Sequence, residues 1–171
     1  RHTTHDEYFS FIDFVKGLRS NNFGRFVLFA SAMTLCVNIS APLLAFFLLK
    51  DLGFSYASYM VVVTTASVSA FLFQGFWGKL GDLDGNIKTL RIAGWGIALI
   101  PLAWLITRHL GFIFFVQIAA GCFWGGFNLL VTNFVLEAVP PQLRIRSASY
   151  FNVMNGAALL LGSAVGGFLF E

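Results

Sequence analysis

Amide side chains recur at helical spacing inside the apolar part of this sequence. In the stretch 110–136, polar and small residues follow one another at intervals of four, three, four and four, so they share one helical face. Amides donate and accept hydrogen bonds, and an unpaired amide in hydrocarbon costs several kcal/mol. Such a face either holds helices together or lines an aqueous pathway, and we favour the pathway. The face contains Gln117, Gly121, Trp124, Asn128 and Thr132.

Three more amides lie in two other apolar stretches. Asn38 lies near the middle of 23–49 and shares a helical face with Ser31 and Thr34. Asn152 and Asn155 are three residues apart in the stretch 147–170 and face inward by the same cost argument.

These amides suit a polar or zwitterionic solute, and the indole of Trp124 can stack on a ring or a cation. The residues that we predict to line a substrate cavity are Asn38, Gln117, Trp124, Asn128, Asn152 and Asn155.

Ionisable side chains are missing from the middle of every apolar stretch. No Asp, Glu, Lys, Arg or His lies in the central third of any of them, whereas proton relays in membranes use such groups. A membrane-embedded enzyme would need a nucleophile with a base, a metal cluster or paired carboxylates at depth. We therefore expect no catalytic residue, no metal site and no cofactor, and we expect Cys36 and Cys122 to be small buried side chains.

The composition predicts a membrane protein. Of the 171 residues, 57% are hydrophobic and only 11% are charged, whereas soluble domains average about 25% charged residues. Each of five apolar stretches can cross roughly 30 Å of hydrocarbon as a helix. The predicted fold is all-α, a polytopic membrane helix bundle with spans at about 23–49, 55–77, 89–106, 110–136 and 147–170.

Residues 1–22 form the only long polar segment. Thr4 and Glu7 have the spacing of a capping box, and apolar residues follow at helical intervals. The segment is too short and too polar to span, so we predict an amphipathic helix that lies on the membrane surface. The alternative is a solvated linker.

Basic residues predict the orientation of the chain. Nine of them lie before the first span, between the second and third, and between the fourth and fifth, against two on the opposite side. The positive-inside rule places the nine in the cytoplasm, and with them the N-terminal segment. They are Arg1, Lys16, Arg19, Arg25, Lys79, Lys88, Arg91, Arg144 and Arg146, against Lys50 and Arg108.

A charged, glycine-rich loop is predicted between the second and third spans, at residues 78–88. It resembles the signature loop of the major facilitator superfamily, roughly Gly-x-Leu-x-Asp-(Arg/Lys)-x-Gly-(Arg/Lys)-(Arg/Lys). The match is carried by Gly78, Leu80, Asp82 and Gly85, whereas Leu83, Asn86 and Ile87 stand where the family has basic residues and Lys88 follows one position late.

The resemblance extends over nearly the whole chain. Gly162 to Gly167 are similar to the glycine-rich motif of the fifth helix of a half-transporter, without its proline. The spacing of Glu137 and Arg144 is similar to a cytoplasmic Glu-x6-Arg motif that implies an ion pair. The resemblance implies a connector plus helices seven to eleven of a twelve-helix transporter. Because the chain begins at Arg1 and ends inside an apolar stretch, we expect a fragment that lacks its N-terminal half.

The resemblance implies a secondary active transporter that moves a small polar or amphipathic solute by alternating access between two rocking halves. Gly78, Asp82, Gly85 and Lys88 would form a gating loop, in which the Asp82 carboxylate binds helix N-terminal amides or a basic partner in one state only. The expected partners are the lipid bilayer and the solute, with no nucleic acid. The expected location is the plasma membrane, a bacterial inner membrane. A non-transporting scaffold or receptor derived from the same fold is the alternative.

Overall fold

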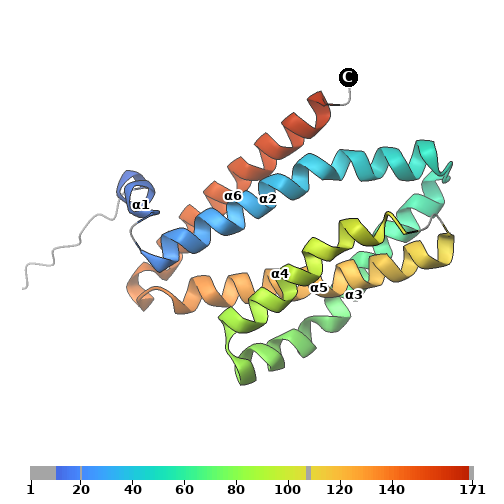
Figure 1. Cartoon of the computed structure of the whole chain (residues 1–171). Helices are drawn as coiled ribbons and strands as arrows, with labels where there is room; N and C mark the ends of the chain where they lie inside the picture. Colours follow the sequence, from blue (N-terminus) through green and yellow to red (C-terminus); the bar gives the residue numbers. More distant parts are fainter. Residues whose placement is uncertain (1–10, 20, 107–108, 170–171) are drawn as a thin grey trace, which may run out of the picture. The chain divides into compact units, whose positions relative to one another are not determined.

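The computed structural model describes residues 11–19, 21–106 and 109–169, and these are almost wholly helical (Figure 1). No strand occurs in this part of the chain, so the predicted all-α membrane bundle is confirmed. The elements are α1 (Phe11–Gly17), α2 (Asn22–Phe46), a π-helical turn (Phe47–Asp51), α3 (Tyr56–Asp84), α4 (Asn86–Ala103), α5 (Leu110–Glu137), a 3-10 turn (Pro141–Leu143) and α6 (Arg144–Phe168).

Four helical segments of the described residues are long and apolar enough to cross a membrane: Asn22–Asp51, Tyr56–Asp84, Leu110–Glu137 and Pro141–Phe168. They overlap the predicted spans 23–49, 55–77, 110–136 and 147–170, whose crossing of the membrane stays a prediction. Helix α4 overlaps most of the remaining predicted span, 89–106. Its first two turns carry two basic residues, Lys88 and Arg91. Whether α4 crosses the membrane stays a prediction.

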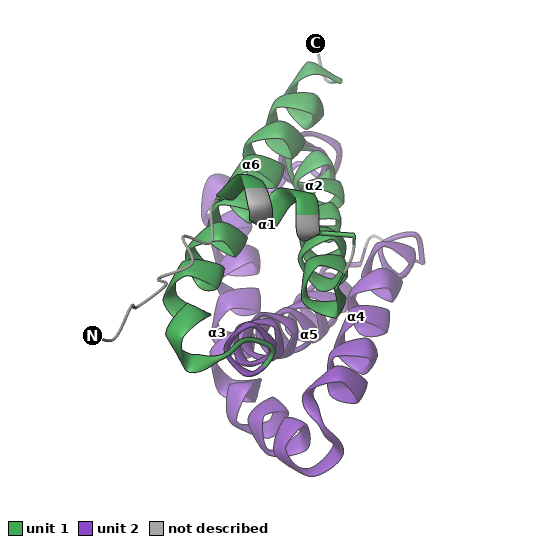
Figure 2. Ribbon diagram, turned by 90° about the vertical axis from the view of Figure 1, so that its left-hand side faces the viewer, with its two compact units in different colours: residues 1–42, 138–171 green, residues 43–137 purple. Residues whose placement is uncertain are grey.

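The helices belong to two compact units, coloured separately in Figure 2. Unit 1 is formed by residues 1–42 and 138–171 and contains α1, most of α2, and α6. Unit 2 is formed by residues 43–137 and contains α3, α4 and α5. The chain passes from one unit to the other at Pro42, inside α2.

Helix α5 is the central element of unit 2, because it packs against both α3 and α4. Gly121 and Gly125 of α5 lie against the backbone of Ala66 and Ala70 of α3. A Cβ atom at Gly125 would stand 2.6 Å from the Ala70 carbonyl oxygen, so only glycine permits this approach. Close contact between small residues is how helices associate in lipid.

Helix α4 packs on a second side of α5. Gly96 accepts the ring of Phe123 against its backbone, and Ala93 and Ile97 are buried beside it. The opposite face of α4 is apolar and open, with Trp95 72% exposed. An exposed apolar face of this kind suits contact with lipid.

The predicted loop at 78–88 is wrong, because almost all of it is helical. Helix α3 continues through Gly78 and Asp82 to Asp84, and α4 begins at Asn86. The single residue between them, Gly85, has φ +86°, a conformation that glycine adopts without strain. Its N–H donates to the Gly81 carbonyl at 2.9 Å and so closes α3. The glycines therefore serve a one-residue corner rather than a flexible loop.

Unit 1 is held by a similar contact between α2 and α6. Gly162 and Gly166 of α6 lie against the backbone of Leu35 and Ile39 of α2. Added Cβ atoms would stand 2.6 Å from the carbonyl oxygens of those two residues. The contact joins the last two turns of α6 to the central and C-terminal parts of α2.

The predicted amphipathic helix is present in part as α1. Thr4 and Glu7 lie outside the described residues. Phe14 and Leu18 are 3% and 5% exposed, and the Phe14 ring lies 5.3 Å from that of Tyr150 on α6. One face of α1 is therefore covered by protein. Contact with a membrane surface stays a prediction for the other face.

The glycine contact in unit 2 predicts unequal effects of two matched substitutions. Gly125→Ala forces α3 and α5 apart and should lower the free energy of unfolding by about 1–3 kcal/mol. Gly75→Ala, on α3 with no atom within 4 Å of the new methyl group, should be neutral or stabilising because alanine is the better helix former. Thermal unfolding midpoints of the purified protein in detergent measure both. Equal midpoints for the two variants would contradict the assigned contact.

Candidate functional site: amides in the spanning helices

The polar face of α5 begins with a residue that joins two helices. Gln117 is 6% exposed, and its Nε2 donates to the carbonyl oxygen of Val62 on α3 at 3.2 Å. One turn later Gly121 contacts Ala66 of the same helix. The predicted cavity role of Gln117 does not match this geometry, because its amide nitrogen is used in a buried contact between α3 and α5.

The other end of this polar face points away from α3. Contacts with α3 move around α5 along its length, because Gly126 meets the ring of Trp77 and Leu130 lies beside Gly81. At 100° per residue, Gly126 and Leu130 lie on the opposite side of α5 from Asn128. Asn128 is accordingly exposed.

The remaining members of the face have local partners. Trp124 is half-buried, and its ring meets Phe127 edge to face at 5.8 Å. Thr132 Oγ1 donates to the Asn128 carbonyl one turn back, at 2.9 Å. Neither contact uses the Asn128 side chain. The predicted continuous polar face is thus divided into a buried contact and an open end.

In unit 1, Thr34, Asn38 and Asn155 form a connected group that we call the amide cluster. Thr34 Oγ1 donates to Asn155 Oδ1 at 3.1 Å, between α2 and α6. Asn38 Nδ2 donates to the Thr34 carbonyl at 2.8 Å, within α2. All three residues are half-buried.

The amide cluster contains polar groups that no hydrogen bond from the described residues uses. Among the described residues, no protein group bonds Asn38 Oδ1 or Asn155 Nδ2. Pro42 also removes the amide hydrogen that would bond the Asn38 carbonyl in a regular helix. The two side chains therefore offer one acceptor and one donor group to a ligand or water, and the Asn38 carbonyl oxygen is a second acceptor.

One threonine and one serine of α2, Thr34 and Ser31, also belong to this polar region. The cavity prediction omitted Thr34, although its spacing to Asn38 had placed both on one face. Ser31, one turn earlier, is 7% exposed, and its hydroxyl has no hydrogen-bond partner in the described part of the chain. Asn152 lies close before Asn155 on α6 and is exposed. The structure thus links Asn38 and Asn155 through Thr34, and Asn152 takes no part in these hydrogen bonds.

Residues 78–88, which we call the signature segment, carry charges at the corner between α3 and α4. Lys88 Nζ lies 3.3 Å from Asp84 Oδ1, with both side chains largely exposed. Asp82 is exposed, one turn before the corner. A Cβ atom added at Gly78 would stand 3.7 Å from Leu129 Cδ2 of α5. The gating role predicted for this segment stays a prediction.

Glu137 has a partner that the sequence did not predict. Asn86 Nδ2, at the start of α4, donates to Glu137 Oε2, at the end of α5, at 2.6 Å. This bond ties the corner of the signature segment to α5 within unit 2. Arg144 belongs to unit 1, so the predicted Glu137–Arg144 ion pair stays a prediction.

No group of three His, Cys, Asp or Glu side chains that could hold a metal ion occurs among the described residues. The candidate site consists instead of amides, one indole and hydroxyls on apolar helices. The fold and this site together define the chain as part of a multi-pass, all-helical membrane protein.

Comparison with known proteins identifies the family. The profile of the Major Facilitator Superfamily matches residues 26–171, and the chain belongs to this family of transporters. A probable peptide/nitrate transporter of Arabidopsis thaliana is 27% identical over 123 residues, which cover 70% of this chain and 24% of the relative. The efflux pump azaK of Aspergillus niger is 27% identical over 119 residues, which cover 70% of this chain and 25% of the pump.

The chain spans about a quarter of the length of these two curated relatives. No solved structure matches the chain at the significance required for the other comparisons.

The division of the α5 polar face predicts which amide stabilises the fold. Gln117→Met removes the bond to Val62 and should lower the free energy of unfolding by about 1 kcal/mol. Asn128→Leu, at the exposed end of the same face, should leave it nearly unchanged. Unfolding midpoints in detergent measure both variants. A larger loss for Asn128→Leu than for Gln117→Met would contradict the assignment.

Proposed function

We propose that the chain is part of a secondary active transporter that moves a small polar or amphipathic solute across the membrane by alternating access. The amide cluster is the observation that carries this proposal. Its unused acceptor and donor lie at Asn38 and Asn155, on two helices that can cross the membrane. A polar group that is left open in a spanning helix is costly, which supports a role in binding solute or water.

Within the described spans the solute would be bound by hydrogen bonds, and the counter-charge for an ionic solute would come from the rest of the transporter. The central parts of the described spans carry no ionisable side chain, so an ionic solute would find no fixed counter-charge there. Asn128, exposed on α5, is the third amide that we assign to the pathway. Trp124 would supply an aromatic surface beside it. We still assign Asn152 to the cavity, but we no longer assign Gln117 to it.

The signature segment would act in gating. Asp82 lies exposed on the last turns of α3, where a carboxylate is free to bind a basic group or helix N-terminal amides in one state of the cycle. The corner at Gly85 and the Asp84–Lys88 ion pair would hold this carboxylate in place. A proton or ion carrier would lie outside the described spans.

The membrane orientation is also a proposal. The five basic residues of unit 1 in 11–42 and 138–169 all lie near the beginnings of α2 and α6. The positive-inside rule places these helix beginnings, and the N-terminal segment with them, in the cytoplasm. A plasma membrane location fits this arrangement, and the bacterial inner membrane stays a prediction. We infer no catalytic activity and no cofactor.

A transport assay on the full-length protein in vesicles tests the function. Nitrate, a labelled dipeptide and a cationic dye such as ethidium are suitable probes, because the two relatives are named as a peptide/nitrate transporter and an efflux pump. Asn155→Leu removes a hydrogen-bonding group from the amide cluster and should lower kcat/KM about tenfold, which corresponds to about 1.4 kcal/mol.

Ser149→Ala on the same helix is the matched control. Its hydroxyl is exposed and bonds the Ile145 carbonyl of its own helix at 2.9 Å, so its transport should equal that of the unaltered protein. If Asn155→Leu transports as well as this control, the amide cluster is not the solute site. If the unaltered protein moves none of the probes across the membrane, the scaffold or receptor alternative gains support.

A further inference from the structure

Helix α1 is fixed to the protein by one face. Phe14 and Leu18 are buried, and the Phe14 ring lies 5.3 Å from Tyr150 of α6 and 6.1 Å from Phe23 of α2. Phe11 adds an edge-to-face contact with Tyr150 at 5.4 Å. Helix α1 is therefore anchored to the beginnings of two helices that can cross the membrane.

The start of α2 lies directly beside the end of α1. Asn21 Oδ1 accepts a hydrogen bond from the Gly24 N–H at 2.5 Å and so caps α2. The Leu18 backbone lies directly against Gly24. Because the first amides of a spanning helix lie at the polar boundary of the bilayer, a crossing of the membrane by α2 would bring α1 within reach of the lipid headgroups.

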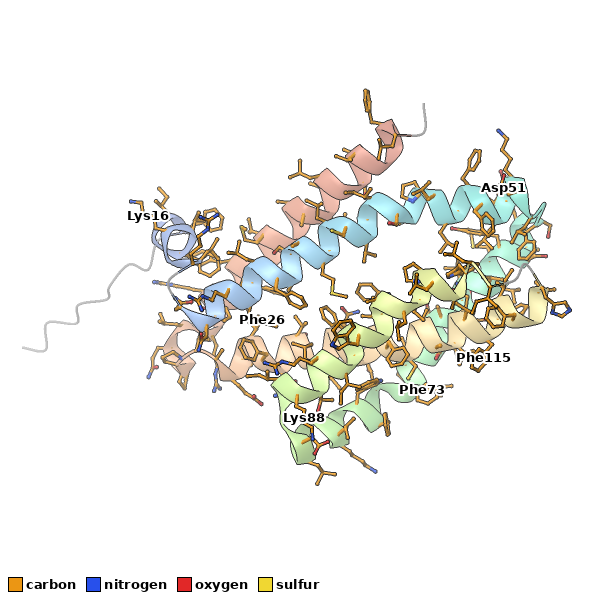
Figure 3. The ribbon with its side chains drawn as sticks, in the orientation of Figure 1. Lys16, Phe26, Asp51, Phe73, Lys88 and Phe115 are labelled. Carbon is orange, nitrogen blue, oxygen red and sulfur yellow. The ribbon has the colours of Figure 1, made fainter. Side chains whose placement is uncertain are left out.

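The exposed side chains of α1 and of the residues just after it combine apolar groups with cations. Ile12 is 62% exposed and Val15 is 42% exposed. Lys16, which Figure 3 shows extending outward from α1, and Arg19 beyond its end are also exposed. This combination is typical of helices that insert apolar side chains between lipid chains while their cations reach the headgroups.

The surrounding surface of unit 1 is strongly basic. The described stretches 11–42 and 138–169 of this unit contain five Lys or Arg residues against one acidic residue, Asp13. The basic residues are all exposed. They are Lys16, Arg19, Arg25, Arg144 and Arg146.

We propose that α1 and the adjoining cations form a docking surface for the headgroups of anionic phospholipids. The exposed apolar side chains distinguish a lipid from a soluble anion, because a free phosphate would gain nothing from Ile12 or Val15. The excess of positive charge distinguishes an anionic lipid from a zwitterionic one. Each Lys or Arg near an anionic membrane surface strengthens binding by about fivefold. The inference does not depend on transport activity.

The test follows the environment of α1 in the full-length protein. An environment-sensitive dye is attached to Val15→Cys in a background with Cys36→Ser and Cys122→Ser, and the protein is placed in nanodiscs that contain nitroxide-labelled lipid. In phosphatidylcholine alone, quenching of the dye should be weak. Adding phosphatidylglycerol should increase quenching, and high salt should reverse the increase by screening.

Lys16→Gln with Arg19→Gln should raise the phosphatidylglycerol fraction needed for half-maximal quenching at least about fivefold. Lys50→Gln with Arg91→Gln is the matched control, because it removes the same charge from exposed positions in unit 2 and should cause no such shift. Equal quenching in the two lipids, or equal shifts for the two double variants, would overturn the proposal.

Two further additions distinguish other anionic partners. Inorganic phosphate or an acidic polypeptide, added to nanodiscs of phosphatidylcholine alone, should leave the dye unchanged. A response to either additive as large as the response to phosphatidylglycerol would overturn the lipid assignment in favour of that partner. The salt reversal in the unaltered protein keeps the proposal testable even if the double variant fails to fold.

Discussion

The close contact of α3 with α5 is the constraint on which the arrangement of unit 2 depends. Lipid chains are as apolar as leucine, so helices in a membrane associate through tight packing and hydrogen bonds rather than through the hydrophobic effect. Gly121 and Gly125 supply the packing by admitting the backbone of α3, and Gln117 supplies a bond to Val62 at 3.2 Å. In this unit the buried amide of Gln117 therefore stabilises the contact between the two helices.

The same contact determines which polar groups stay open. Because α3 passes from one side of α5 to the other along its length, the face that begins in a helix contact at Gln117 ends exposed at Asn128. Unit 1 repeats the pattern with glycines of α6 against α2, but there the neighbouring Asn38 and Asn155 keep an acceptor and a donor unused. Tight packing by small residues thus places open amides in the spans, which is what a site for a polar solute requires.

Periodicity was sufficient to predict the helices, and the cost of burial indicated a partner for Asn155, whereas Asn152, predicted to face inward by the same argument, is exposed. Periodicity and cost could not decide whether each amide joins two helices or lines the pathway. That choice depends on how far α3 winds around α5, and the spacing of residues within one helix contains no such information. The segment at 78–88 was misread because glycines and charges are typical of loops, whereas here Gly81 serves close packing and only Gly85 has a positive φ. The bond from Asn86 to Glu137 joins positions far apart in the sequence, and no local pattern could have indicated it.

The most direct test of the account is whether water reaches the amide cluster. Single cysteines at Asn155 and at Leu160, in the full-length protein with Cys36→Ser and Cys122→Ser, can be exposed to a water-soluble thiol reagent. Leu160 is 70% exposed on an apolar stretch of α6, and we assign its side chain to the lipid-facing surface. The account predicts that the reagent modifies Asn155→Cys and leaves Leu160→Cys unmodified. An unreactive Asn155→Cys, or faster modification of Leu160→Cys, would contradict it.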